Sequence, residues 1–395
     1  KESYTVRKIK SRRRVKETER VEVFLKQIYK RYYFSRVEEV EAPTRIGERE
    51  FGYLPFGGTM VRHLSFKNEG ELKAQIVKEA PRSVYYSIAY YYDPTLPMQE
   101  KGWKGADIAF DIDCDDLNLE CKKDHDVWTC SSCGVRGKGN KPRRCRCGST
   151  SFKQLNWVCP KCLEGAKEEV KKLIEILVSD LGFTKKQIKI YFSGSKGYHV
   201  TVEGTDFEYL DQMGRMELAD YVCGRGLQPE FIGIAKTSNV DDLWRRLPAL
   251  GESGWRGRVA EYFAGNNRTD PREKIIEIYA KSGYRGFKKV LEECVKKIGV
   301  TIDSNVTIDI HRILRLPGTL HNETGLIKKR VASLDSFDPL VDSVAFGNEH
   351  IEVEVIYAPP FTLLGQHYAL EPLQKVKLPL AAAVYLLGQG LAKLV

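Results

Sequence analysis

The chain of 395 residues carries 63 Lys and Arg against 53 Asp and Glu, a formal net charge of +10, and this basic excess favours a polyanionic partner. Its 42% hydrophobic and 10% aromatic residues exclude disorder along the whole chain. The longest apolar run, residues 378–387, is too short to span a bilayer and contains a proline, so we expect no membrane contact. No secretory signal is recognisable, and we expect an intracellular, cytoplasmic protein.

The N-terminal segment divides into a basic part and an amphipathic part. Residues 1–20 hold nine basic and three acidic side chains, so we expect a basic arm that is either a solvated tail or a contact for nucleic acid. From residue 21 onward, apolar residues recur at helical spacing, which predicts a helix packed on a core: Val21, Phe24, Leu25, Ile28 and Tyr32.

Residues 106–113 alternate between apolar and acidic side chains, which predicts a strand. Asp107, Asp111 and Asp113 are expected on one face of it. Carboxylates close together repel one another unless a cation neutralises them, and Mg²⁺ prefers such oxygen ligands. Pairs of this kind also occur in calcium loops and at strand ends, so the pattern alone does not define a catalytic site.

Seven cysteines between residues 121 and 162 lie mostly in close pairs, which predicts metal binding in a reducing compartment. One quartet has the spacing of a zinc ribbon: Cys130, Cys133, Cys145 and Cys147. Cys130 and Cys133 could instead join Cys159 and Cys162. Basic residues surround the quartet and either contact a nucleic-acid backbone or are simply exposed: Lys138, Lys141, Arg143, Arg144 and Arg146. We expect ordinary thiols at Cys114, Cys223 and Cys294.

The middle of the chain contains a glycine loop between two predicted strands. Apolar spacing predicts a helix over residues 170–181 that Gly182 ends, followed by strands over 189–192 and 198–202. The loop 193–197 is rich in small residues, which let backbone N–H groups approach phosphate oxygens. A plain hairpin turn is the alternative. The spacing of a Walker P-loop is absent.

Residues 206–298 are polar and helix-like, with a breaker-rich stretch at 251–267, and we expect an inserted helical subdomain. Beyond it we expect a strand near Val306, a short helix over 310–314, a strand over 351–357 and a last helix over 381–394. On this pattern Asp309 is an N-cap of the short helix, whereas Asp303 has no helix to cap. The mixture of helices and strands predicts a core of the α/β or the α+β class, and we expect α+β.

Four motifs occur in a fixed order along the chain: Arg49–Tyr53 with Arg62–Phe66, Phe110–Asp113, Ser193–His199, and Asp303–Asp309 leading to Arg315–His321. Together they resemble the small catalytic subunit of archaeal and eukaryotic DNA primases, the archaeal form most closely, from about Val21 to the C-terminus. The resemblance implies a primase-polymerase (prim-pol) catalytic domain over 21–395. A zinc-binding insertion at 117–163 and the helical subdomain at 206–298 would interrupt this domain.

The resemblance also implies roles for individual residues. It places the catalytic carboxylates, which would bind Mg²⁺ or Mn²⁺, at Asp111, Asp113 and Asp303. It places the nucleotide contacts at Glu50, Arg62, Ser193, Gly194, Lys196, Gly197, His199, Arg315 and His321. Ser195 departs from the basic residue of the eukaryotic enzymes. A zinc site is implied at Cys121, His125, Cys159 and Cys162, beside the second zinc quartet described above.

The implied activity is that of a nucleotidyltransferase that starts primers de novo on a single-stranded DNA template by two-metal catalysis during replication. Its implied partners are a large primase subunit, the template and nucleoside triphosphates. Two alternatives remain: a repair or translesion polymerase of the same superfamily that only extends existing primers, and a zinc module that binds nucleic acid without chemistry. Asp303 and Asp309 compete for the role of third metal ligand.

Overall fold

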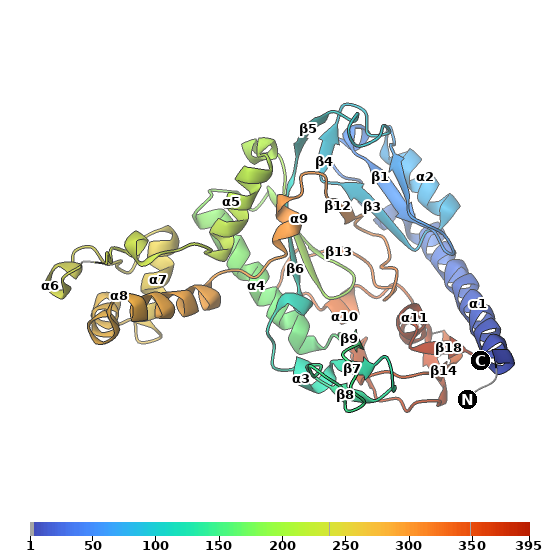
Figure 1. The fold of residues 1–395 in the computed structure, drawn as a ribbon. Helices are drawn as coiled ribbons and strands as arrows, with labels where there is room; N and C mark the ends of the chain where they lie inside the picture. Colours follow the sequence, from blue (N-terminus) through green and yellow to red (C-terminus); the bar gives the residue numbers. More distant parts are fainter. Residues whose placement is uncertain (1–3, 237, 348) are drawn as a thin grey trace.

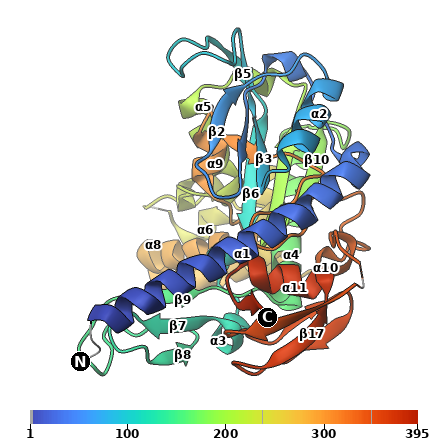
Figure 2. The same ribbon diagram turned by 90° about the vertical axis from the view of Figure 1, so that its right-hand side faces the viewer.

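The computed structural model describes residues 4–236, 238–347 and 349–395 and shows an α+β protein (Figure 1). Its N-terminal sheet has the strand order β12-β3-β1-β2, with every neighbouring pair antiparallel. The bounds of these strands are β1 (Phe51–Leu54), β2 (Val61–Leu64), β3 (Ser83–Ser87) and β12 (Ile313–Arg315). A long helix, α1 (Tyr4–Arg36), packs against α2 (Glu69–Glu79) and against the C-terminal elements (Figure 2).

The second sheet carries the acidic strand. Its order is β13-β10-β11-β6, again antiparallel throughout. The bounds are β6 (Ile108–Asp113), β10 (Ile188–Phe192), β11 (Gly197–Val202) and β13 (Lys329–Arg330). Helix α4 (Pro160–Ser179) packs on β6 and β11, because its apolar face is buried over Leu163, Val170, Leu173 and Leu177.

Smaller units surround the two sheets. A three-stranded sheet β8-β7-β9 follows α3 and contains the cysteine quartet: α3 (Lys122–His125), β7 (Val127–Cys130), β8 (Arg136–Lys138) and β9 (Phe152–Leu155). The C-terminal sheet β17-β14-β18 packs with α11: β14 (His350–Val355), β17 (Lys375–Pro379), α11 (Leu380–Gly388) and β18 (Ala392–Leu394). The remaining short elements are β4 (Ala89–Tyr91), β5 (Trp103–Ala106), α10 (Pro339–Asp342), β15 (Phe361–Leu363) and β16 (Gln366–Tyr368).

Residues 206–298 are largely helical, as the sequence predicts. The helices are α5 (Gln212–Cys223), α6 (Val240–Leu243), α7 (Gly254–Ala264) and α8 (Pro271–Ile298). α7 lies within the stretch expected to be rich in breakers. α6, α7 and α8 project from one side of the molecule (Figure 1) and bury an apolar cluster of their own that includes Val259, Ile275, Phe287 and Leu291.

The sequence predictions hold at the N-terminal helix and fail at several short elements. Leu25, Ile28 and Tyr32 are buried on α1, and residues 4–20, expected as a separate arm, are the first part of the same helix. Residues 1–3 of that arm lie outside the described residues.

Three predictions after residue 300 are wrong, and the reasons differ. The strand expected near Val306 is the short helix α9 (Ser304–Ile308), and the helix expected over 310–314 is replaced by strand β12. β12 exists because it pairs with β3, far away in the sequence, and a five-residue helix is too short to show periodicity. The last helix ends at Gly388 rather than at 394, and the chain turns at Gly390, whose φ is 70°, into β18.

Candidate active site

Strand β6 places Asp111 and Asp113 on the same face, because side chains two residues apart in a strand point the same way. In the antiparallel pairing with β11, His199 lies opposite Asp111 and Gly197 lies opposite Asp113. The His199 Nε2 atom is 3.5 Å from Asp111 Oδ1. A side chain cannot replace the hydrogen of Gly197, since a Cβ there would lie 1.9 Å from the carbonyl oxygen of Ile112.

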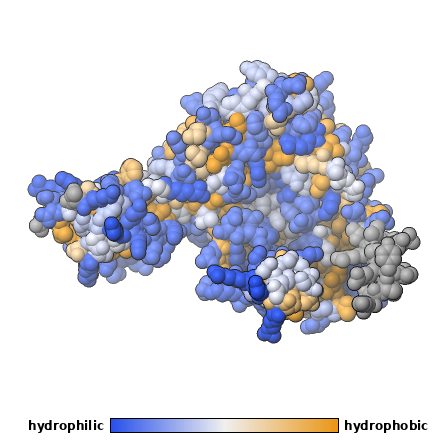
Figure 3. All heavy atoms as spheres, in the orientation of Figure 1, coloured by the Kyte–Doolittle hydropathy of each residue, from blue (hydrophilic) through white to orange (hydrophobic). Residues whose placement is uncertain are grey.

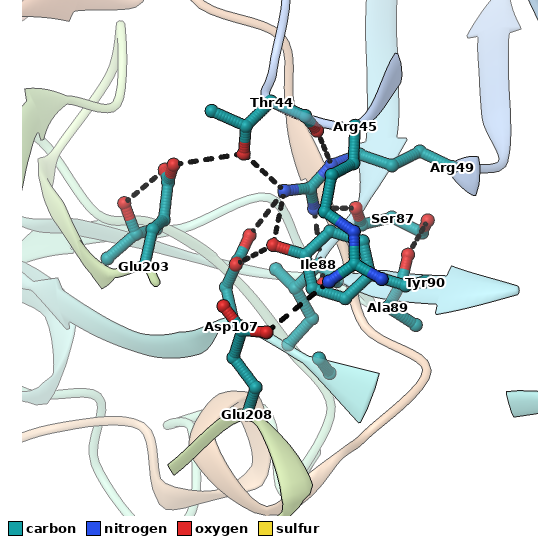
Figure 4. Close-up of polar contacts among 12 residues, drawn as sticks. Thr44, Arg45, Arg49, Ser87, Ile88, Ala89, Tyr90, Asp107, Glu203 and Glu208 are labelled. Atoms are coloured by element: carbon teal, nitrogen blue, oxygen red, sulfur yellow. Dashed lines mark hydrogen bonds and ion pairs between the residues drawn. The ribbon is translucent and has the colours of Figure 1, made fainter. Parts of the chain in front are cut away.

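Asp107, expected on the same face, lies elsewhere. It precedes β6, is fully buried and pairs with Arg49, whose guanidinium is 2.7 Å from its Oδ2 atom (Figure 4). The chain leaves the strand conformation between β5 and β6, so the alternation does not extend back to this residue.

Asp303 joins the carboxylate pair through its backbone. Its N–H donates to the carbonyl oxygen of Asp111 at 2.9 Å, which brings the start of α9 against β6. Burial first, and then the charges of Asp113 and Asp303, raise the pKa of Asp111 to about 7, although Arg312 opposes the shift. Burial also raises the pKa of Asp113. The structure therefore places Asp113 and Asp303 close enough to Asp111 for their charges to disfavour its ionised form.

The capping roles of Asp303 and Asp309 are the reverse of those expected. Asp303 is the N-cap of α9, because its side chain accepts a hydrogen bond from the backbone N–H of Asn305. Asp309 follows α9 and accepts from the backbone N–H of His311 at 2.9 Å. The prediction that Asp309 is the N-cap of a helix over 310–314 is wrong, because residues 313–315 form a strand and Asp309 is instead the C-cap of α9.

The glycine loop is the turn of the β10–β11 hairpin, since the backbone N–H of Ser193 donates to the carbonyl of Gly197 at 2.8 Å. Side chains from other parts of the chain fix it. Arg315 on β12 donates to the carbonyl of Ser193 at 2.9 Å, and the Thr324 hydroxyl donates to the carbonyl of Gly194. Lys196 forms an ion pair with Asp115, with 2.7 Å between Nζ and Oδ2. The turn is thus held between cations and the acidic strand.

Two histidines beside the loop are held neutral. Burial, followed by the charges of Lys328 and Arg315, holds the pKa of His199 well below its usual value. Burial and the charge of Arg315 also hold the pKa of His321 well below its usual value. His321 Nδ1 accepts from the backbone N–H groups of Glu323 and Thr324, so its Nε2 carries the proton and is available to donate.

Several buried polar atoms here have no hydrogen-bond partner among the described residues. They are Nδ1 of His199 and the Nε atoms of Arg82 and Arg315. Buried polar atoms are normally paired, so these three atoms are available to a bound polar ligand or to water.

Glu50 and Arg62 form the expected pair, with 2.9 Å between Arg62 Nε and Glu50 Oε1. A third member, Lys101, is fully buried and lies 2.8 Å from the other carboxylate oxygen. Burial acts to raise the pKa of Glu50, but hydrogen bonds from Lys101 and Arg62 outweigh it and lower the pKa below its usual value.

Sequence reasoning missed two lysines in this region. Lys101 has no motif around it, and Lys328 belongs to an ordinary basic run that leads into the edge strand β13. Lys328 is fully buried and donates to the carbonyl of Arg315 at 2.7 Å. Burial, and then Arg315, lowers the pKa of Lys328 to about 7.

The cysteines form two groups that could each hold a metal ion: Cys121, His125, Cys159 and Cys162, and Cys130, Cys133, Cys145 and Cys147. Tetrahedral zinc with sulfur ligands at about 2.3 Å separates the sulfurs by about 3.8 Å. The sulfurs of Cys130 and Cys147 are 3.7 Å apart, and those of Cys133 and Cys145 are 3.6 Å apart. The alternative grouping of Cys130 and Cys133 with Cys159 and Cys162 is wrong.

A residue next to the first group orients its histidine. His125 directs Nε2 to Cys162 Sγ at 3.2 Å, while its Nδ1 lies 2.9 Å from the carboxylate of Asp126. A carboxylate on the far nitrogen of a ligating histidine is the usual second contact in zinc sites, because it fixes the ring and its tautomer. Cys114 is not a ligand, but its sulfur lies 3.1 Å from the carbonyl of Cys162.

Known proteins match the chain across nearly its whole length. The family described as "DNA primase small subunit" matches residues 152–333. The DNA primase small subunit PriS of Nitrosopumilus maritimus is 39% identical over 370 residues, 93% of this chain and 97% of the relative. That of Cenarchaeum symbiosum is 39% identical over 371 residues (94% and 98%), and that of Archaeoglobus fulgidus is 32% identical over 373 residues (93% and 97%).

Fold, site and relatives together define an enzyme of the nucleotidyltransferase class that makes primers. The chain belongs to the DNA primase small subunit family, as its motifs predict. Its role lies in DNA replication. Among its described helices, none combines the length and the apolar character needed to cross a membrane.

Proposed function

We propose that this chain starts primers de novo on single-stranded DNA, with Asp111, Asp113 and Asp303 holding Mg²⁺ or Mn²⁺. The observation that carries the proposal is the gathering of these three carboxylates, which raises the pKa of Asp111 to about 7 by burial and mutual repulsion. Oxygen ligands of this charge suit hard divalent cations, which would stabilise the ionised forms. The α+β core would then be a prim-pol domain, with insertions at 117–163 and 206–298.

The metal ions, when bound, would activate a 3′-hydroxyl for attack and stabilise the leaving pyrophosphate. The chain's own residues bind the nucleotide. Lys196, Arg315 and the backbone of the 193–197 turn surround a place where buried donors lack partners, which suits a triphosphate. His321 offers its Nε2 proton to an acceptor, and Glu50 and Lys101 hold Arg62 in position.

The proposed partners are a large primase subunit, the DNA template and nucleoside triphosphates. The relatives are named small subunits, which implies a larger one. The test compares the incorporation of labelled nucleotides on unprimed and on primed single-stranded DNA, with the large subunit present. We expect short products on both templates. Extension of the primed template alone would support the repair or translesion polymerase, and DNA binding without incorporation on either would support the non-catalytic module.

The two cysteine groups predict close to two zinc ions per chain. Changing Cys145 and Cys147 to Ser together should lower the zinc content by one, because tetrahedral zinc is not retained by two thiolates alone. Elemental analysis of the purified protein measures this, with Cys223→Ser as the control, since Cys223 lies in neither group. A content near one in the unaltered protein would exclude the group of Cys130, Cys133, Cys145 and Cys147 as a zinc site.

The third metal ligand can be identified by comparing Asp303→Asn with Asp309→Asn. Asn caps helices as well as Asp does, so neither change should shift the melting temperature by more than a few degrees. Only Asp303 adjoins Asp111, so Asp303→Asn alone should lower turnover, by roughly a hundredfold or more, since metal stabilisation is worth several kcal/mol. Loss of turnover in Asp309→Asn instead would assign the ligand to Asp309.

A further inference from the structure

The three-stranded sheet β8-β7-β9 and its loops, residues 127–155, here called the basic ribbon, have an extreme charge. Between Asp126 and Glu164 the sequence contains no acidic residue, yet the chain as a whole has a net charge of only +10. Eight basic residues lie in that interval: Arg136, Lys138, Lys141, Arg143, Arg144, Arg146, Lys153 and Lys161. Seven of them lie in the basic ribbon and Lys161 lies in α4, so the ribbon carries seven cations and no carboxylate.

These cations are exposed and are not neutralised. All eight side chains are exposed, and in the part of the chain that the structure describes none of them forms an ion pair with a carboxylate. Helix α4 shows the usual arrangement, in which Lys171 and Lys172 pair with Glu168 and Glu169. Among these cations, Arg136 is the one that contacts an aromatic ring of the described residues, with its guanidinium 4.8 Å from the ring centre of Tyr357. The others are free to bind a polyanion.

The ribbon also constrains the backbone that carries these cations. Trp128 packs on Gly137, where a Cβ would lie 2.3 Å from the indole ring, and meets Phe152 edge-on. Arg146 lies between Cys145 and Cys147 in the turn that the cysteine group closes, and Arg143 and Arg144 directly precede it. Because these backbones are constrained, less conformational entropy is lost when the cations meet a ligand.

The ribbon lies beyond the end of the acidic strand. The chain leaves β6 at Asp113 and continues through a short turn and α3 into β7, so the ribbon follows that end of the sheet (Figure 1). Strongly hydrophilic side chains project from the same edge of the molecule in Figure 3. A strand held at the three carboxylates could therefore continue over this surface.

We infer that the basic ribbon binds the phosphodiester backbone of the nucleic acid on which the enzyme acts, independently of base sequence. The inference rests on the proposed function and adds to it a contact surface separate from the carboxylates and the glycine loop. Unpaired cations on a constrained backbone, without an intervening carboxylate, match a chain of phosphates, since counterion release makes such contacts favourable. An acidic protein partner would recognise the same positive charge, and the experiment below distinguishes nucleic acid from such a partner.

The test uses the full-length, zinc-loaded chain carrying Arg143→Gln, Arg144→Gln and Arg146→Gln together. Binding of fluorescent single-stranded DNA and of a primer–template duplex is measured by anisotropy over a range of salt concentrations. We expect at least a tenfold loss of affinity, and a slope of log affinity against log salt that is smaller by about 2, because each lost phosphate contact removes roughly 0.7 on a single strand. The two DNAs show whether the ribbon contacts the template strand or the duplex product.

A matched control removes the same number of charges from exposed, unpaired lysines elsewhere: Lys185→Gln, Lys186→Gln and Lys289→Gln. It should bind DNA like the unaltered protein. Zinc content reports whether the ribbon is intact, and Lys138→Gln with Lys141→Gln is a second variant that leaves the turn at Cys145 unchanged. Equal affinity and salt slope in the ribbon and control variants would overturn the inference, as would lost association with the large subunit while DNA binding stays unchanged.

The assay is independent of the proposed chemistry. Nucleotide incorporation by the unaltered chain tests the proposed function, whereas anisotropy tests only contact with nucleic acid. If the unaltered chain incorporates nucleotides but the ribbon variant binds DNA normally, the inference fails and the proposed function stands. If no incorporation occurs on any template, the proposed function fails whatever the binding data show.

Discussion

Asp111→Asn should abolish nucleotide incorporation and should stabilise the protein in the absence of added divalent metal. Asp111 is a buried carboxylate beside Asp113 and Asp303, and its pKa is raised to about 7, so its ionised form destabilises the folded state. An amide removes that charge and keeps the shape of the side chain. It also removes a proposed metal ligand, which should lower turnover by roughly a hundredfold or more, as several kcal/mol are lost.

The pH dependence of stability is a second test of the prediction that the ionised carboxylate of Asp111 destabilises the folded protein. Because the pKa is raised on folding, the folded state retains a proton that the unfolded state releases between about pH 4 and pH 7. The contribution of Asp111 to stability should therefore fall as the pH rises through this window, whereas the lowered pKa values of His199 and His321 contribute in the opposite direction. The comparison with Asp111→Asn isolates the contribution of Asp111. Without added divalent metal, the melting temperature of the unaltered protein relative to that of Asp111→Asn should fall as the pH rises, and exposed Asp335→Asn should behave like the unaltered protein. Appreciable turnover in Asp111→Asn, or an unchanged pH slope, would contradict the assignment.

Arg49→Met should lower the free energy of unfolding by roughly 3–5 kcal/mol, because it leaves the buried carboxylate of Asp107 without its cation. The Arg49 side chain is 0% exposed and that of Asp107 is 1% exposed. Its guanidinium also donates to the carbonyls of Thr44 and Ser87, each at 2.8 Å (Figure 4). The interaction joins the segment before β1 to the start of β6, and so it holds Glu50 in place relative to the acidic strand.

Denaturant unfolding measures this loss of stability, and the variant Arg45→Met is the control. Arg45 lies beside the same network, but its side chain is 38% exposed and pairs with Glu48, so Arg45→Met should change stability by at most about 1 kcal/mol. Arg49→Met combined with Asp107→Leu should recover much of the loss, since apolar residues can replace a buried ion pair. A loss below about 1 kcal/mol in Arg49→Met alone would contradict the account.

The sequence was most informative where structure is local. Alternating side chains predict β6, and apolar runs around small residues predict β10, β11 and the turn between them, because these features depend on neighbours in the sequence. Cysteine spacing likewise predicts the quartet of the ribbon, since paired ligands sit on tight turns.

The errors arise where distant residues decide the outcome. Strand β12 depends on its pairing with β3, and Asp107 is withdrawn from the acidic face by Arg49, which lies 58 residues earlier. Lys101 and Lys328 become site residues only because folding buries them beside Glu50 and Arg315. The expectation for Asp309 failed together with the helix it was meant to cap, whereas the expectation that Asp303 joins Asp111 depended on the family resemblance.

The most direct test of the proposed site is a structure of the chain with Mn²⁺ and a nucleoside triphosphate. Anomalous scattering locates the manganese without reference to the protein. We expect it at the carboxylates of Asp111, Asp113 and Asp303, with the phosphates against the 193–197 turn and the side chains of Arg315 and His321. Manganese bound elsewhere, or a triphosphate that contacts neither the turn nor Arg315, would contradict the account.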